Sequence, residues 1–323
     1  MVEKKHLPDT DSWLVVVNPN SGDKKIGKDW KKIDKYLKQQ GLQFDAVFTE
    51  RKGHALELSE KYIREGRKKI IIAGGDGTIN EVVNGAFNQD KYPTSEITLA
   101  LILAGTGNDW GRMYDIPVDY KQAVKTIKEG RTFLQDAGKV SYQHEGMKET
   151  RFFVNIAGMG YDALVAKKTN RLKERGRGGT LSYFYNLLAG LFEYKQRNID
   201  VFIDGVDVFS GKIFSMSIGI CCYNGGGMKQ LPNAIPDDGL LDITLIKETR
   251  RMEVVRNIRK LYDGSFINLH MIEVFKGRTV TVETKPGHSV FLEADGESLG
   301  QSPMLFEIIP RSIRLIIPKK YGQ

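Results

Sequence analysis

Short apolar runs alternate with amphipathic stretches in the first part of the chain. The runs at 13–17 (WLVVV), 44–49 (FDAVFT), 69–75 (KIIIAGG) and 97–103 (ITLALIL) predict strands, because they are rich in β-branched residues and end at turn signals. Between them, apolar residues at helical spacing predict helices near 30–37, 54–65 and 79–87. Apolar strands that alternate with helices indicate a parallel sheet with helices on both faces.

The pattern changes after about Gly138, where strand-like segments follow one another. Turn signals such as Asp204-Gly205 and Pro286-Gly287 separate these segments, which is typical of antiparallel strands. The segments lie at 151–158, 199–205, 212–222, 240–246, 279–285, 289–295 and 312–318. Two helices are expected among them, at 181–194 and at 249–262, where Met252, Val255 and Ile258 share a face. This half predicts a mainly antiparallel β-sandwich or barrel-like domain.

Length and composition narrow the classes of protein that remain. A chain of 323 residues is long enough for two domains, and we expect an α/β domain at 1–138 followed by a β-rich domain at 139–310. No apolar run reaches the roughly 18 residues of a membrane span, and the first residues do not resemble a signal peptide, so we expect a cytoplasmic protein. The two cysteines, Cys221 and Cys222, lie in an apolar strand pattern and are expected in the core.

A net charge of +8 leaves three classes of partner open, namely nucleic acid, an anionic membrane and phosphorylated ligands. The sequence contains no recognisable basic and aromatic nucleic-acid module, so we expect no nucleic-acid partner.

Three turn-rich stretches follow predicted strands: 18–22 (NPNSG), 74–78 (GGDGT) and 104–109 (AGTGND). Ligands bind beyond the carboxyl ends of parallel strands, glycines let backbone amides approach a phosphate, and a helix N-terminus attracts an anion. Thr78 is expected to cap the helix that follows, with Glu81 as its capping-box partner. One such stretch is usually only a turn, but three at one sheet edge favour a nucleotide site. The spacing matches neither a Walker A loop nor a Rossmann fingerprint.

Five blocks, in this order, resemble the diacylglycerol kinase catalytic-domain family: GGDGTINEVVNG, AGTGNDWGR, AGMGYDALV, IPDDGLLDITLI and EADGE. The resemblance covers nearly the whole chain, and its compact length is similar to the bacterial soluble diacylglycerol kinase and YegS-like branch. It implies a first domain like that of NAD kinase, ATP bound in a cleft between two domains, and a last strand (311–323) that returns to the first domain. The resemblance also implies the nucleotide-binding residues, which are Asn18, Ser21, Lys24, Thr49, Gly74, Gly75, Asp76, Gly77, Thr78, Gly105 and Thr106.

The same resemblance implies the chemistry. Mg²⁺ would be held by Asp238, by the backbone carbonyls of Ile235 and Leu240, and by an aspartate network that includes Asp76 and Asp109. Glu297 matches the general base and completes a catalytic set with Asp76 and Asp295. Gly160 and Asp162 match a further block that supports the expected cleft. Alone, PDDG and DGE are the patterns of ordinary turns.

A lipid kinase must reach the bilayer, so the expected partner is a lipid at the inner face of an anionic membrane. The basic stretch 167–177, which holds Lys167, Lys168, Arg171, Lys173, Arg175 and Arg177, is a candidate contact. The acceptor predicted is diacylglycerol, with ATP and Mg²⁺ as cofactors. Alternatives are a sphingoid base, phosphatidylglycerol or a polyprenol as acceptor, an NAD kinase, and a nucleotide sensor with an idle site. Bacterial members of the family can be dimers, so a homodimer is also expected.

Overall fold

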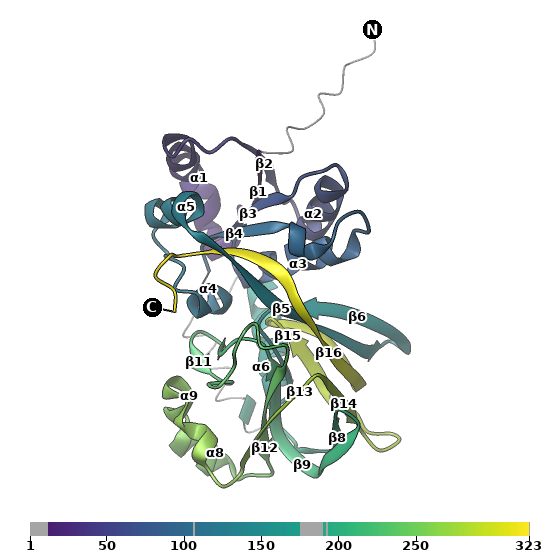
Figure 1. The fold of residues 1–323 in the computed structure, drawn as a ribbon. Coiled ribbons are helices and arrows are strands. Elements are labelled where there is room, and N and C mark those ends of the chain that lie inside the picture. Colours follow the sequence, from purple (N-terminus) through teal and green to yellow (C-terminus); the bar gives the residue numbers. More distant parts are fainter. Residues whose placement is uncertain (1–11, 106, 175–189, 192, 323) are drawn as a thin grey trace. The chain divides into compact units, whose positions relative to one another are not determined.

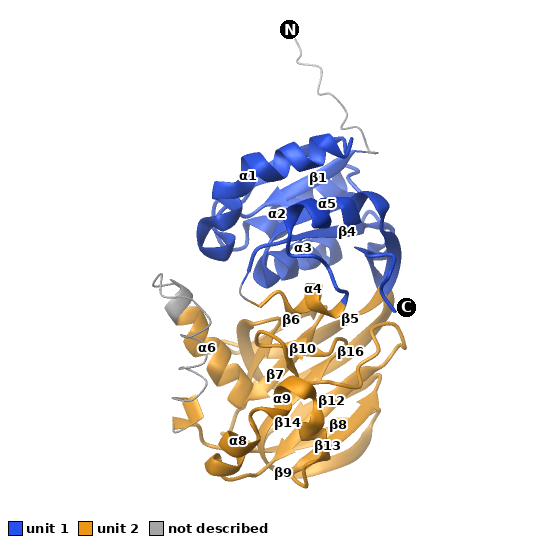
Figure 2. Cartoon of the chain, turned by 90° about the vertical axis from the view of Figure 1, so that its left-hand side faces the viewer, with its two compact units in different colours: residues 1–105, 114–134, 312–323 blue, residues 106–113, 135–311 orange. Residues whose placement is uncertain are grey.

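The fold is described from a computed structural model that covers residues 12–105, 107–174, 190–191 and 193–322. The chain forms two compact units, shown in different colours in Figure 2. Unit 1 consists of residues 1–105, 114–134 and 312–323, and unit 2 consists of residues 106–113 and 135–311. The division after 134 lies close to the expected boundary at 138, but residues 106–113 belong to unit 2 instead of the first domain.

Unit 1 is built on a parallel sheet with the strand order β16-β4-β3-β1-β2. Its strands are β1 (Trp13–Val17), β2 (Phe44–Phe48), β3 (Lys69–Gly74), β4 (Thr98–Leu103) and the last part of β16 (Glu297–Ile317). The last strand pairs with β4 through Arg314 and Leu315, which lie opposite Thr98 and Leu99. The final segment of the chain therefore completes a sheet that begins at residue 13.

Helices cover both faces of this sheet (Figure 1). On one face, α1 (Ser21–Gln39) and α5 (Tyr120–Glu129) bury Ile33, Leu37 and Val124 against strand residues such as Val15 and Ile71. The other face carries α2 (His54–Arg64) and α3 (Asp76–Asn88), which pack closely on each other. The expected α/β architecture of the first domain is confirmed, because apolar strands buried on both faces require exactly such a cover of helices.

Unit 2 is mainly antiparallel. Its strands are β5 (Arg131–His144), which begins in unit 1, β6 (Met147–Phe153), β7 (Ile156–Gly160), β8 (Arg197–Ile203), β9 (Val206–Gly219), β10 (Tyr223–Asn224), β11 (Met228–Lys229), β12 (Leu241–Lys247), β13 (Ile272–Gly277), β14 (Thr279–Glu283), β15 (Phe291–Ala294) and the first part of β16. The helical segments are α4 (Asp109–Met113), α6 (Tyr161–Glu174), α8 (Arg251–Asn257), α9 (Lys260–Asp263) and the 3₁₀ turn η2 (Ser265–Asn268).

Two long strands close unit 2 on itself. β9 pairs with β8 through its first half and with β7 and β12 through its second half. β16 pairs with β15 near its start and with β14 further along. Since β8 also pairs with β14 and β7 pairs with β15, these strands form a closed circuit. The expected antiparallel sandwich or barrel-like domain is confirmed, and its two thiols, Cys221 and Cys222, are buried and half-buried respectively.

Several elements differ from the sequence prediction. The segment 151–158 is two strands, β6 and β7. The sequence did not predict the strands β5, β10, β11 and β13 or the helices α4, α5 and α6. The expected helix at 249–262 is broken into α8 and α9, and its Met252 is 61% exposed instead of packing inward. The expected helix at 181–194 lies almost wholly outside the described residues. Within the described part of the chain, no helix is both long and apolar enough to cross a bilayer.

Candidate active site

Three turns of unit 1 converge at the carboxyl ends of its strands. The side-chain amide of Asn18, after β1, donates to the hydroxyl of Thr78 in α3 at 2.8 Å. The backbone of Gly22 lies so close to β4 that a Cβ atom there would be 2.8 Å from the carbonyl oxygen of Ala104. Gly22 also has φ of +62°, which glycine adopts without strain. The stretches 18–22, 74–78 and 104–105 therefore form one surface, as the strand order predicts.

The N-terminus of α3 opens at this surface. Gly75 is the N-cap residue and has extended backbone angles. A Cβ atom at Gly75 would meet Gly105 Cα at 3.6 Å, an ordinary contact, so packing within unit 1 does not require glycine there. By contrast, a Cβ atom at Gly74 would lie 2.7 Å from the side chain of Thr78. Gly74 is thus needed for packing, whereas Gly75 leaves the first amides of α3 accessible to an anion.

The capping box expected at this helix is wrong. The N-cap is Gly75, and Thr78 lies inside the first turn with its hydroxyl accepting from Asn18. Glu81 accepts hydrogen bonds from the backbone amides of Gly53 and Ala55 at 2.8 and 3.1 Å. Glu81 therefore caps α2, the neighbouring helix. Because the N-cap residue of α3 is Gly75, Glu81 lies in the second turn of that helix, too far along it to reach the first amides.

The remaining nucleotide candidates of unit 1 occupy the same edge. Ser21 begins α1 and its amide donates to the carbonyl of Asn18, while buried Thr49 donates its amide to Val17 at the end of β1. Lys24 is exposed and has a left-handed backbone with φ of 66°. The acidic residue of the first turn of α3 is Asp76, followed by Gly77. Thr106 lies outside the described residues.

In unit 2, the turn between β15 and β16 carries Asp295, Gly296 and Glu297. Both oxygens of Asp295 accept backbone amides, from Asn155 at 3.0 Å and from Val154 at 3.1 Å. Asp295 therefore holds the turn against the connection between β6 and β7, and its role here is structural. Glu297 is the first residue of β16 and, like Asp295, is partly exposed.

A buried carboxyl pair lies beside that turn. Glu293 is 2% exposed and accepts from the amide of Gly296 at 2.9 Å and from the side chain of Asn224 at 3.2 Å. Burial, with the neighbouring charge of Asp162, raises the pKa of Glu293 to about 8. Burial likewise raises the pKa of Asp162 to about 7, against the opposing effect of the hydroxyl of Ser217, which donates to it at 3.2 Å. The sequence analysis did not identify Glu293, because a strand glutamate carries no motif.

Asp109 organises a glycine turn in unit 2. Its two oxygens accept the backbone amides of Gly226 and Gly227 at 2.8 and 2.7 Å. Burial raises the pKa of Asp109, while these two amides and Arg112 lower it. Both glycines have positive φ, of 85° and 99°. The turn at 224–227 is a second feature that was missed, although its run of three glycines is a visible signal.

The expected metal loop, 235–240, contains a cluster of acidic side chains. Asp136 fixes the loop by accepting the amide of Gly239 at 2.7 Å. Asp238 accepts from the amide of Leu240 at 3.0 Å and from the ammonium of Lys276 at 3.1 Å. The ammonium also lies 3.2 Å from Asp242, whose pKa is raised chiefly by burial.

Carboxylate and carbonyl oxygens are suitable ligands for Mg²⁺, and the loop has more carboxylates than cations, so its residues fit a hydrated Mg²⁺. Among the described residues, no three His, Cys, Asp or Glu side chains converge as a ready-made metal cage. Asp238 would therefore supply one side-chain ligand, with the carbonyls of Ile235 and Leu240 and water completing the shell.

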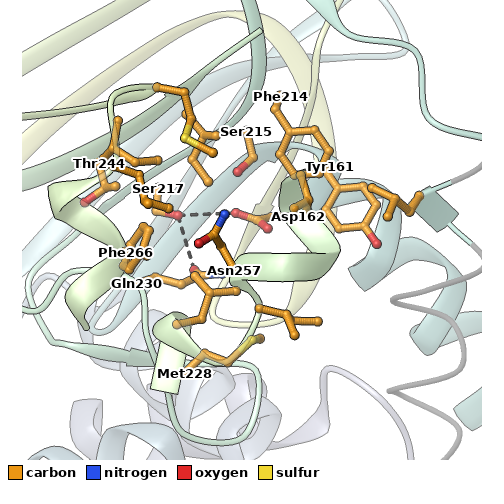
Figure 3. Close-up of a pocket in the computed structure, with 18 of the residues that line it drawn as sticks. Tyr161, Asp162, Phe214, Ser215, Ser217, Met228, Gln230, Thr244, Asn257 and Phe266 are labelled. Atoms are coloured by element: carbon orange, nitrogen blue, oxygen red, sulfur yellow. Dashed lines mark hydrogen bonds between the residues drawn. The ribbon is translucent and has the colours of Figure 1, made fainter. Parts of the chain in front are cut away.

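Unit 2 also contains a partly open pocket (Figure 3). Most of its lining is apolar, including Phe214, Ile246, Ile258 and Phe266. Its polar groups include Asp162, Ser217 and Gln230, and Ser217 lies within hydrogen-bond distance of both of the others, as the dashed lines in Figure 3 show.

The polar end of the pocket lies close to the turn that bears Glu297. A Cβ atom at Gly158 would meet both Glu293 and Asp162, at 2.7 and 2.9 Å, so these two side chains pack against the same glycine. Glu293 in turn holds the amide of Gly296, the neighbour of Glu297. The pocket is therefore suited to an apolar ligand with one polar group.

Comparisons with known proteins agree with this geometry. Residues 12–140 match the diacylglycerol kinase catalytic domain, and residues 155–317 match the YegS C-terminal NAD kinase beta sandwich-like domain. The chain is 30% identical over 311 residues to a diacylglycerol kinase of Bacillus subtilis, covering 96% of this chain and 97% of that protein. It is 28% identical over 305 residues to a diacylglycerol kinase of Staphylococcus carnosus, covering 94% of each.

Solved structures show the same fold. A Bacillus anthracis structure covers 95% of both chains with a TM-score of 0.76 at 25% identity. A second structure, described as a diacylglycerol kinase from that organism, has a TM-score of 0.69 at 23% identity and covers 95% of this chain and 96% of its own. The protein is thus a kinase that transfers phosphate to a hydroxyl acceptor. On this evidence the chain belongs to the diacylglycerol kinase catalytic-domain family of bacterial lipid kinases.

Proposed function

We propose that the protein uses ATP and Mg²⁺ to phosphorylate the free hydroxyl of diacylglycerol, giving phosphatidic acid. The observation that carries this proposal is the pocket of unit 2, whose apolar walls suit acyl chains. Its polar residue Asp162 packs against the same glycine as Glu293, which holds the turn that bears Glu297. We place the activity in the cytoplasm, at the inner face of the membrane, because the acceptor is a membrane lipid. The names of the relatives from B. subtilis and S. carnosus favour the same acceptor.

The nucleotide is assigned to the convergent turns of unit 1. Gly75 and the first amides of α3 are arranged to receive phosphate oxygens, and the helix dipole adds a favourable field there. The bond between Asn18 and Thr78 fixes the loop after β1 against this helix. Lys24 is exposed and carries the positive charge nearest in sequence to that loop, so we assign it to the phosphates as well.

When bound, Mg²⁺ would offset the negative charge of the phosphates. Asp238 and the carbonyls of its loop are the proposed ligands. Asp109, whose oxygens each accept one backbone amide and one of which also faces Arg112, is assigned to the aspartate network around the ion. We assign Asp76, in the first turn of α3, to the same aspartate network.

In the proposed step, Glu297 accepts the proton of the acceptor hydroxyl as its oxygen attacks the γ-phosphorus. The bond from the γ-phosphorus to the β-γ bridging oxygen breaks, and ADP leaves. Asp295 holds the turn, and the neutral form of Glu293 keeps a second negative charge away from the reacting hydroxyl. A positioned general base contributes about 10²- to 10⁴-fold to such a rate.

The decisive experiment is transfer of labelled γ-phosphate from ATP to dioctanoylglycerol, sphingosine, phosphatidylglycerol, undecaprenol and NAD in parallel. We expect label in phosphatidic acid, and label only in another acceptor would replace the substrate. E297Q should lower kcat by about 10²- to 10⁴-fold while a fluorescent ATP analogue still binds. E283Q, at an exposed glutamate of β14, is the matched control. Near-normal turnover of E297Q would refute its role as base.

A further inference from the structure

The segment α8–α9 has one face toward the pocket and one toward solvent. Val254, Ile258 and Leu261 line the pocket. On the other side, Met252 is 61% exposed and Tyr262 is 48% exposed, although both are large and apolar in part. Two such side chains on one short segment are unusual unless another surface covers them.

The same solvent-facing side is basic. Arg250, Arg256 and Arg259 are exposed, and none of the three forms an ion pair with any residue in the described ranges. The segment's two carboxylates have local partners. Glu253 accepts from the hydroxyl of Thr249 at 2.9 Å, with His270 at 3.7 Å, and Asp263 accepts from the amide of Ser265 at 2.8 Å. The exposed surface therefore combines uncompensated arginines with apolar side chains.

The pocket reaches the surface at this segment. Val255 lines the pocket and is also 37% exposed, so it belongs to both the interior wall and the outer face. Figure 1 shows α8 and α9 together at the lower left, at the edge of unit 2. A ligand that enters beside Val255 would pass from the exposed surface of α8 into the apolar pocket.

We propose that the α8–α9 rim, defined as Arg250, Met252, Val255, Arg256, Arg259 and Tyr262, docks on the surface of an anionic phospholipid bilayer. Docking there places the mouth of the pocket at the membrane, so the lipid acceptor can enter without crossing water. This inference rests on the proposed function, whose acceptor is a membrane lipid.

Charge and chemistry favour a bilayer over other occupants. Arginine side chains bind lipid phosphates while their stems remain in the apolar interface, and Met and Tyr insert at the headgroup level. A second copy of this rim would bring like charges together. The basic stretch 167–177 is less suited, because Lys168 pairs with Glu193 at 2.6 Å and Lys167 lies over the ring of Phe291; the rest of its basic side chains, apart from Arg171, lie outside the described residues.

The contribution of the three arginines to membrane binding is tested by co-sedimentation with vesicles in the absence of ATP. The probe is a vesicle of phosphatidylglycerol and phosphatidylcholine, and the variant is R250Q/R256Q/R259Q. We expect binding at least about tenfold weaker, because each basic residue near an anionic surface contributes roughly a factor of five. The control K28Q/K31Q/K35Q removes three exposed lysines of α1 and should change binding by less than about threefold. Equal losses in both variants would overturn the assignment to the rim.

Insertion of the apolar side chains of Met252 and Tyr262 into the bilayer needs a separate variant. M252Q/Y262Q should weaken the binding that remains at high salt, where screening suppresses the charge contribution. M147Q/V206Q removes two other exposed apolar side chains, 63% and 64% exposed, and should bind as the wild type does. Unchanged binding of M252Q/Y262Q at high salt would contradict insertion.

A soluble substrate separates this inference from the proposed function. With a short-chain diacylglycerol below its micellar concentration, R250Q/R256Q/R259Q should turn over at the wild-type rate, while on vesicles it should be slower by the factor lost in binding. If the wild type phosphorylates diacylglycerol neither in solution nor in vesicles, the proposed acceptor is refuted. The vesicle-binding result would still test the docking proposal. If R250Q/R256Q/R259Q instead shifts a wild-type dimer to monomer and keeps vesicle binding, the rim is a protein interface and the proposal fails.

Discussion

The side-chain amide of Asn18 donates to the hydroxyl of Thr78 at 2.8 Å, joining the loop after β1 to the first turn of α3 across 60 residues of sequence. Both residues lie in stretches that sequence motifs single out, but the bond between them is visible only in the fold. It fixes the two loops of unit 1 that are proposed to hold the phosphates.

Removing the hydroxyl at Thr78 should therefore affect the nucleotide more than the fold. Thr78 is buried, and valine has nearly the same shape, so T78V should lower the free energy of unfolding by only about 1 kcal/mol. The loosened loop should raise the KM for ATP several-fold with a smaller change in kcat. T132V, at an exposed threonine of β5, is the control. Steady-state kinetics and chemical denaturation measure both effects, and a KM equal to that of the control would contradict the assignment.

Two glycines of unit 1 should separate binding from folding. G75A has room for its methyl group, so its midpoint of thermal unfolding should stay near that of the wild type while ATP affinity falls at least about tenfold, because the methyl group meets the incoming phosphate. At Gly85, a Cβ atom would be 2.0 Å from the hydroxyl of Ser59 on α2, so G85A should lose about 1–3 kcal/mol of stability. Thermal scans and ATP titration distinguish the two variants. Normal ATP binding by G75A would contradict the assignment of the phosphates to the N-terminus of α3.

Much of unit 1 was predictable because periodicity is a local property. Its strands and the helices α1, α2 and α3 overlap the segments that the apolar pattern predicts, whereas α5 was not predicted. The glycine stretches meet because parallel strands end at one edge. The partner of Glu81 was not predictable: a capping box and a cap on a neighbouring helix share one sequence, and only the packing of α2 on α3 selects Gly53 and Ala55. The sequence pattern identifies Glu81 as a capping residue, but only the tertiary structure shows which helix it caps.

The site in unit 2 was harder to predict for the same reason. Glu293 is a carboxyl in an alternating strand, where a solvated face is the usual outcome, and its burial depends on Asn224 and Asp162, which are distant in sequence. The helix at 249–262 shows the opposite error, since Met252 fits an inward stripe but faces solvent. Burial in unit 2 is decided by strand pairings that close over long sequence separations.

The buried carboxyls predict how stability depends on pH. The pKa values of Asp162 and Glu293 are raised to about 7 and about 8, so the folded chain binds these protons more tightly than the unfolded chain. Their contribution to the free energy of unfolding is therefore greatest at about pH 4 and is lost as pH rises through 7 and 8. For E293Q, the fall in the free energy of unfolding between pH 5 and pH 8.5 should be smaller by about 3–4 kcal/mol.

Urea denaturation at those two pH values measures this effect. The slope with pH is the readout, because glutamine offers one acceptor oxygen where the carboxylate offers two and the absolute stability therefore changes as well. E283Q is the control, since it removes an exposed glutamate of the same unit. Parallel pH profiles for the wild type and E293Q would contradict burial of the charge.

Magnesium should stabilise the protein through Asp238. If Asp238 holds the ion, a concentration 100 times its Kd should add about 2.7 kcal/mol to the free energy of unfolding, and EDTA should remove it. D238N should lose this response, whereas D237N, one residue away, removes the same charge and should keep it. The readout is the Mg²⁺-dependent shift of the unfolding midpoint, without substrate. Equal shifts in both variants would place the ion elsewhere.

The last strand has a consequence for biosynthesis. β4 leaves the ribosome with one neighbour, β3, and the segment of β16 that covers its other edge is made about two hundred residues later. At translation rates of about 5–20 residues per second, that edge stays unpaired for roughly 10–40 s. An apolar strand with open backbone groups is a template for pairing with other nascent chains. During this interval, a chaperone that covers the edge of β4 would prevent such pairing.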